Sequence, residues 1–222
     1  MDVDLNALWL TLKVASWATA VAAVLGVGCG LALAKGRWPG KRVAEAVLTL
    51  PMVLPPTVLG YYLIVVLGRN APVGQWLSTH FDITLMFTWQ GAVIAASVVA
   101  FPLVFTSARA AFEGVNRDFE KAARVLGAGE LKVFLQVTLP LAMRGITAGT
   151  MLAFARAMGE FGATLMIAGN IPGKTQTLSM AIYDAVQSGN DALANTLVIV
   201  ISLLCIVILV VSSRLLNPRP ER

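Results

Sequence analysis

Long apolar runs constrain this chain more than any other feature of its sequence. One of them, Ala192–Ser213, contains no charged side chain. A bilayer core about 30 Å thick requires about 20 apolar residues in each helical span. Only 13% of the 222 residues are charged and the mean hydropathy is +0.76, so a water-soluble fold is close to excluded. We therefore predict an all-α integral membrane protein.

Five such runs predict five transmembrane helices in a single membrane domain that occupies residues 1–222. The approximate spans are 8–34, 44–67, 87–108, 144–168 and 193–215. The second span contains Pro51, Pro55 and Pro56, and each proline removes a backbone hydrogen-bond donor. We expect this helix to be kinked or locally unwound. The loops that remain are too short for a separate catalytic domain of about 100 residues.

Two pairs of glycines lie within the predicted spans at a spacing of four residues. Gly26 and Gly30 belong to the first span, and Gly145 and Gly149 belong to the fourth. Small residues at this spacing allow helices to approach closely, so we expect both pairs to lie at contacts between helices.

Lysine and arginine are concentrated on one side of the predicted membrane. The stretch 35–42 holds four of them, the stretch 109–144 holds six, and the C-terminal stretch from Arg214 holds three. The other side has Lys13, Arg69 and Lys174. Because basic residues accumulate in cytoplasmic loops, this distribution predicts an N-terminus outside the membrane and a C-terminus in the cytoplasm.

The longest basic segment predicts two short helices on the cytoplasmic side. Asn116 is placed to cap an amphipathic helix that runs to Leu126, and Gly127 is placed to end it. A second short helix follows, and Leu139-Pro140 is expected to close it. A segment of this kind either lies on the anionic inner leaflet or is bound by a cytoplasmic partner, and the residue pattern alone leaves both open.

The same segment carries a family resemblance. Residues 120–128, followed by Val137-Thr138-Leu139-Pro140, resemble the EAA loop of binding-protein-dependent ABC importer permeases. In that family the loop forms a coupling helix that docks into a groove on a cytoplasmic ATPase. The resemblance implies an ATPase-coupling role for Glu120, Lys121, Ala122, Ala123, Leu126, Gly127 and Ala128. Lys121 stands where the consensus has glutamate, so the acidic contact would come from Glu120, one position earlier.

The resemblance extends over about residues 8–215 and implies the type I ABC importer permease fold. The stretches 38–41, 50–56, 153–164 and 170–175 are similar to the permease subunits of molybdate importers. Gly159-Glu160-Phe161-Gly162 also occurs in sulfate permeases, so this stretch by itself indicates an importer of oxyanions in general.

The resemblance therefore implies a permease that moves molybdate through the inner membrane of a prokaryote. Its implied partners are a second copy of the chain, cytoplasmic ABC ATPase subunits that bind ATP and magnesium, and an external oxyanion-binding protein. Sulfate, thiosulfate and tungstate are alternative substrates. A different class of function is also open: a membrane scaffold that transports nothing and recruits a soluble partner through its basic loop.

Arg156 and Glu160 are ionisable residues inside the fourth predicted span, four positions apart. Charges at this depth are costly, so both should face protein or water. They form either a structural pair or part of the anion pathway. The three prolines of the second span present the same choice, because broken helices at membrane depth often line a translocation route. Pro51, Pro55, Pro56, Arg156 and Glu160 are therefore candidates for the pathway or its gate.

The motifs of nucleotide binding and catalysis are absent from the sequence. Gly40-Lys41 and Gly173-Lys174 both lack the upstream glycine of a P-loop, so energy from ATP must enter through another subunit. His80 has only Asp82 at a metal-ligand spacing. We predict a transport subunit that is not an enzyme, with no catalytic residue, metal or cofactor on this chain.

Overall fold

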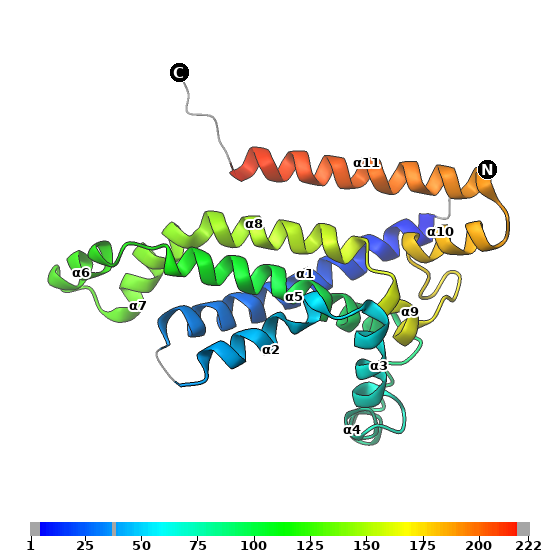
Figure 1. The fold of residues 1–222 in the computed structure, drawn as a ribbon, viewed down its shortest axis with the longest axis horizontal. Coiled ribbons are helices and arrows are strands. Elements are labelled where there is room, and N and C mark those ends of the chain that lie inside the picture. Colours follow the sequence, from blue (N-terminus) through cyan, green and yellow to red (C-terminus); the bar gives the residue numbers. More distant parts are fainter. Residues whose placement is uncertain (1–4, 37–38, 217–222) are drawn as a thin grey trace.

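The computed structural model of the chain describes residues 5–36 and 39–216, and for residues 212–216 it describes the backbone alone. Within these ranges the structure is helical and contains no strand (Figure 1). The elements are α1 (Leu5–Lys35), α2 (Lys41–Val53), α3 (Pro56–Leu67), α4 (Pro72–Phe81), α5 (Trp89–Glu113), α6 (Arg117–Val125), α7 (Glu130–Val133), a π-helical turn (Phe134–Thr138), α8 (Leu139–Met158), α9 (Gly162–Ala168), α10 (Leu178–Gln187) and α11 (Asp191–Leu216). Arg37, Arg219 and Arg222 of the charge distribution, and Trp38 of the resemblance, lie outside the described residues.

Four helices in the described part of the chain are long and apolar enough to cross a membrane. They are α1, α5, the continuous helix from Glu130 to Met158, and α11. The pair α2 and α3 supplies a fifth span if the two are counted together, although they meet at an angle of 113°. The all-α membrane fold is confirmed, and the second span is broken more sharply than a kink.

Proline explains where the second span breaks. Leu54 has an extended backbone (φ −70°, ψ 142°), as favoured for a residue that precedes proline. Pro55 flanks the next helix, and Pro56 occupies its first turn, where the missing N–H costs nothing. The break is therefore determined by three consecutive residues, Leu54, Pro55 and Pro56.

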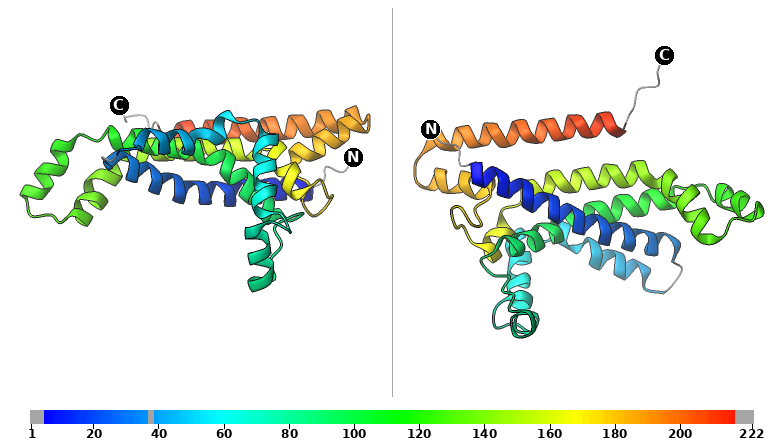
Figure 2. Two further views of the ribbon diagram at one scale, coloured as in Figure 1. Left: turned by 60° about the horizontal axis from the view of Figure 1, so that its bottom comes forward. Right: turned by 180° about the vertical axis from the view of Figure 1, so that it is seen from behind.

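The core of the bundle is formed by α1, α5 and α8, which lie side by side (Figures 1 and 2). A methyl group added at Gly26 would lie 2.9 Å from Val104 of α5, and one added at Gly145 would lie 2.7 Å from Ala111. Both glycine pairs therefore lie at helix contacts, as the spacing predicted. The core around them is rich in fully buried alanines: Ala15, Ala18, Ala92, Ala96, Ala100 and Ala153.

The helix at the fourth predicted span has other bounds than the prediction of 144–168. The helix begins at Glu130, passes through the π-helical turn and ends at Met158, and α9 is a separate helix. Pro140 does not close the preceding helix, because it lies in the first turn of α8, directly after the π-helical turn. A widened turn at this point is the local adjustment that lets a helix continue past a proline.

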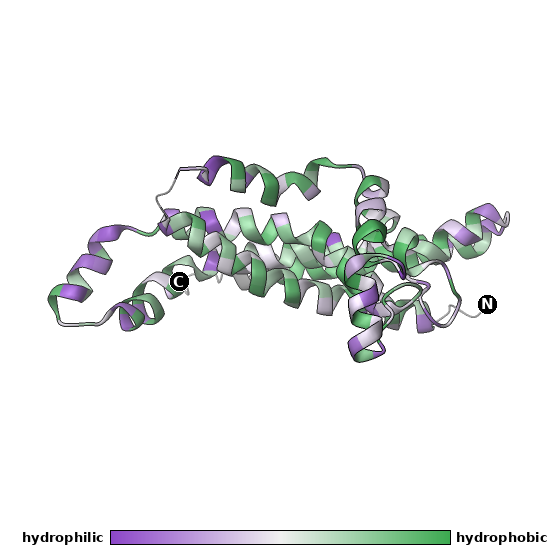
Figure 3. Cartoon of the chain, turned by 90° about the horizontal axis from the view of Figure 1, so that it is seen from below, coloured by the Kyte–Doolittle hydropathy of each residue, from purple (hydrophilic) through white to green (hydrophobic). Residues whose placement is uncertain are grey.

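The stretch between the second and third predicted spans contains the short helix α4, and the stretch between the fourth and fifth contains α10. Together α3 and α4 project away from the long helices (Figures 1 and 2). α10 is anchored to α1, because the Leu178 N–H donates to the Thr11 hydroxyl at 2.8 Å. Hydrophobic residues cover the long helices, whereas hydrophilic residues gather on α6 (Figure 3).

Candidate functional site

The region that matches the expected coupling loop projects beyond the ends of α5 and α8 (Figure 1). Asn116 caps α6, since its side chain accepts from the Asp118 N–H at 2.9 Å, which confirms the predicted start. No residue of α6 is buried. Val125 and Leu126 at its end are 86% and 87% exposed. An apolar tip on a charged projection is suited to contact another protein.

Gly127 ends α6 in the left-handed conformation, with φ +81°. The Gly127 N–H donates to the Arg124 carbonyl at 2.9 Å, and the Ala128 N–H donates to the Ala123 carbonyl at 3.1 Å. These two bonds form a Schellman motif, which satisfies carbonyls at the end of the helix. The glycine predicted to end the helix does so, and its conformation sets the direction in which α7 departs.

Glu120 faces inward, toward the bundle. Its carboxylate accepts from the Thr138 hydroxyl at 2.5 Å and ion-pairs with Lys35 at 3.5 Å and with Arg124 at 3.8 Å. The side chain is 13% exposed. Glu120 thus ties α6 to the end of α1 and to the π-helical turn, and the sequence offered no pattern that pairs residues so far apart.

The same contacts change the acidity of Glu120. The hydrogen bond from Thr138 lowers the pKa of this carboxyl below its ordinary value, and the positive charges of Lys35 and Arg124 act in the same direction against the opposing effect of burial. Glu120 is therefore ionised at neutral pH. Lys121, at the consensus position, points outward and pairs with Asp118 at 3.0 Å. At the position where the consensus of the resembled family has an acidic side chain, this chain therefore presents the basic side chain of Lys121.

Three of the five pathway candidates meet at one cavity. Pro51 and Pro56, on either side of the α2–α3 break, and Arg156 of α8 line a cavity of about 280 Å³ together with Leu54 and Val99. Pro55 flanks the same break and is exposed. The break and the Arg156 cation are therefore brought together by the fold, although they lie far apart in the sequence.

Glu160 contacts the arginine that lines this cavity. It pairs with Arg156 at 2.8 Å, but the two do not share a continuous helix, because α8 ends at Met158. Its second oxygen accepts from the Ala163 N–H at 2.9 Å and so caps the start of α9. The Glu160 side chain is 1% exposed and that of Arg156 is 40% exposed. Glu160 holds the arginine in place, and Arg156 carries the accessible charge.

The structure offers no assembled metal site within the described residues, since no three candidate ligands gather there. The Nδ1 atom of His80 lies 3.0 Å from the Trp76 carbonyl, and its ring stacks on Trp76. This histidine is engaged locally within α4.

Comparison with known proteins identifies a matching family and several similar proteins. The family described as "Binding-protein-dependent transport system inner membrane component" matches residues 23–222. The molybdenum transport system permease protein ModB of Escherichia coli K12 is 44% identical over 222 residues, covering 100% of this chain and 97% of the relative. The sulfate transport system permease protein CysW of Synechocystis is 34% identical over 205 residues, covering 92% of this chain and 74% of the relative.

A solved structure shows the same fold. The inward-facing MetNI methionine ABC transporter aligns with a TM-score of 0.75 over 98% of this chain and 96% of that chain. The sequence identity is 18%, so this similarity concerns the fold alone.

Proposed function

This chain belongs to the family of binding-protein-dependent transport system inner membrane components, and we propose that it is the permease subunit of an ATP-driven importer of molybdate. The observation that supports molybdate as the substrate is the similarity to ModB of E. coli, which extends over the whole chain. The lower identity to the sulfate permease CysW keeps sulfate and thiosulfate as second candidates, with tungstate as the close chemical analogue of molybdate.

The projecting loop formed by α6 and α7 is the proposed binding site for a cytoplasmic partner. We infer that a cytoplasmic ABC ATPase binds α6 and α7 through the exposed Val125 and Leu126, with the ATP and magnesium on that subunit. Glu120, Lys121, Ala122, Ala123, Leu126, Gly127 and Ala128 form the proposed coupling set. Within it, the inward contacts of Glu120 favour a role in holding α6 in position, and the outward Lys121 is placed to meet the partner. This chain itself is proposed to carry out no chemical reaction.

The orientation we propose places α6 in the cytoplasm of a prokaryote, with the N-terminus outside the inner membrane. Lys35 contacts Glu120, and Lys41 contacts Glu113, so the two basic stretches lie at one end of the bundle. Basic residues at one end support this orientation.

The pathway is proposed to pass beside the cavity at the α2–α3 break. Arg156 offers a positive charge there, and the break supplies a change of backbone direction beside it. A second copy of the chain would complete the pathway, and an external oxyanion-binding protein would deliver the anion. A scaffold that transports nothing would have no use for a costly charge at this depth, which favours the transporter.

Uptake in a defined system tests the proposal. The chain, its cytoplasmic ATPase and its oxyanion-binding protein would be assembled in liposomes, and entry of labelled molybdate and, separately, of labelled sulfate would be followed with and without ATP. We expect ATP-dependent entry that excess tungstate reduces and excess sulfate does not. ATP-dependent entry of sulfate alone would reassign the substrate, and a complex that hydrolyses ATP without moving any oxyanion would refute the transport function.

A further inference from the structure

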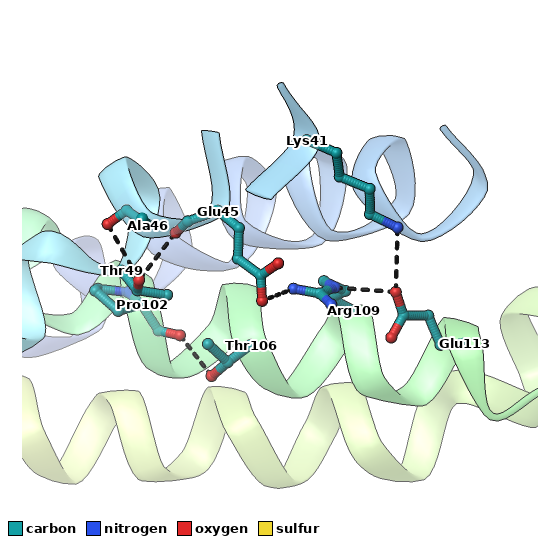
Figure 4. Close-up of polar contacts among 8 residues, drawn as sticks. All are labelled: Lys41, Glu45, Ala46, Thr49, Pro102, Thr106, Arg109 and Glu113. Carbon is teal, nitrogen blue, oxygen red and sulfur yellow. Dashed lines mark hydrogen bonds and ion pairs between the residues drawn. The ribbon is translucent and has the colours of Figure 1, made fainter. Parts of the chain in front are cut away.

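Four charged side chains join the start of α2 to the end of α5 (Figure 4). Arg109 of α5 ion-pairs with Glu45 of α2, and its Nε donates to Glu113 Oε1 at 3.0 Å. Lys41, in the first turn of α2, places its Nζ 3.4 Å from the same Glu113 oxygen. We call Lys41, Glu45, Arg109 and Glu113 the α2–α5 clamp. Because Arg109 and Glu113 are shared, the clamp is a network and not a set of isolated pairs.

Apolar packing does little to hold α2. None of its residues is buried, and Val43 and Val47 are 67% and 61% exposed. A cavity of about 340 Å³ separates its middle from α1 and α5, and Val47, Leu48 and Pro51 form the α2 side of that cavity. The contact between α1 and α5 is different, because glycines there bring the two backbones close together. The clamp is therefore the main polar link between α2 and the bundle in the described part of the chain.

The two ends of α2 lie at the two regions that the proposed function uses. At one end the clamp includes Glu113, the last residue of α5, and only Gly114–Asn116 separate it from α6. At the other end α2 stops at Val53, beside Pro51 and Leu54, which line the cavity that contains Arg156. A helix of 13 residues spans about 20 Å, so α2 can link these regions as a single rigid element.

We propose that the clamp makes α2 move as one body with the end of α5 and with α6, so that a displacement of α6 by the ATPase reaches the cavity at the α2–α3 break. Arg109 is the positioning residue, since it pairs with carboxylates on both helices. It acts through α2 and is not proposed to touch the transported anion. The inference rests on the proposed function, because it requires an ATPase that moves α6.

A distance measurement tests the clamp directly. Spin labels would be attached at exposed positions on the two helices, through Val43→Cys on α2 and Ala110→Cys on α5, after replacement of Cys29 and Cys205 by alanine. The distance between the labels would be measured by pulsed electron resonance in the complex with the ATPase, without nucleotide and with ATP trapped. We expect one narrow distance distribution that is the same in both states.

Arg109→Gln should broaden this distribution and make it depend on nucleotide. It should also lower the amount of molybdate imported per ATP hydrolysed by about threefold or more, with bound ATPase and basal hydrolysis unchanged. The matched control is Arg42→Gln, which removes the same charge from an exposed residue of α2 outside the clamp. It should leave the distance and the transport ratio as they are. Glu45→Gln removes the ion pair between Arg109 and α2, and it keeps both Arg109 and Lys41 beside Glu113. It should reproduce the effect of Arg109→Gln, and it decides the test if Arg109→Gln fails to fold.

Two results would overturn the clamp. One is a label distance that changes with nucleotide while the four residues are intact, because α2 would then move separately from α5. The other is a distribution in Arg109→Gln and Glu45→Gln that matches the Arg42→Gln control. A wild-type complex that binds ATPase but imports no molybdate would refute the proposed function instead, and the label distances in that complex would still decide whether the helices move together.

Discussion

Replacing Gly127 by valine tests whether the end of α6 sets the geometry of the coupling loop. Gly127 has φ +81°, and a side chain in the left-handed region costs about 1–2 kcal/mol, with β-branched residues at the upper end. A Cβ atom at this position would have no neighbour within 4 Å, so the cost lies in the backbone and no steric clash adds to it. A cost of this size changes a conformational equilibrium by a factor of about 5–30. Because α6 has no buried residue, mainly the polar contacts of Glu120 with Lys35 and Thr138 oppose this strain, and the native conformation of the loop should be populated less.

The assay compares this variant with a control two residues away. Gly129 has an ordinary φ of −67° and the same open surroundings, so Gly129→Val adds no left-handed backbone strain and only the ordinary cost of valine at the N-cap of α7. We expect Gly127→Val to insert in the membrane in normal amounts while ATPase co-purification and molybdate uptake fall about 5- to 30-fold. Asparagine tolerates the left-handed region better than valine, so Gly127→Asn should retain more of both activities. Equal losses in the two valine variants, or normal assembly and uptake in Gly127→Val, would refute the reasoning.

Three further predictions concern topology, acidity and selectivity. A reporter active only in the cytoplasm should be active when fused after Arg222 and silent when fused near Ser78, and the opposite pattern would contradict the orientation. Because the pKa of Glu120 is lowered in the folded protein, its contribution to stability is complete above the ordinary carboxyl pKa and is lost as pH falls through the lowered value. Thr138→Val should raise that pKa and move the loss of stability to higher pH. Thermal stability of the purified protein across acidic pH measures this shift, and an unchanged profile would show that the Thr138 hydrogen bond is not the cause of the lowered Glu120 pKa. Calorimetric titration of the purified chain without its binding protein should detect only weak molybdate or sulfate binding, since Arg156 is already paired; submicromolar binding that Arg156→Ala abolishes would show that the permease itself selects the anion.

The sequence predicts well the features that depend on interactions between residues close together in the chain. The cap at Asn116 and the left-handed Gly127 depend on local backbone chemistry, and both have the predicted geometry. The glycine pairs were also predictable, since close approach of helices demands small residues wherever the partner lies. The prolines indicated a broken second span, although not an angle of 113°.

The features that the sequence did not predict depend on contacts between distant residues. The partners of Glu120 lie on α1 and at the π-helical turn, and no periodicity relates Lys35 or Thr138 to it. The cavity that joins Pro51 to Arg156 likewise exists only after α2 and α8 have packed on the bundle. The boundary at Met158 was missed because the apolar composition continues into α9, so hydropathy gave no indication that the helix stops.

The exposed tip of α6 also affects how cells must make this subunit. Val125 and Leu126 are almost fully exposed at the end of α6, a helix with no buried residue. In the proposed complex an ATPase covers these side chains, and without it they offer a binding surface to chaperones and proteases. If the proposed contact is correct, permease made in excess of the ATPase is removed preferentially, and degradation as well as synthesis sets the ratio of the two subunits.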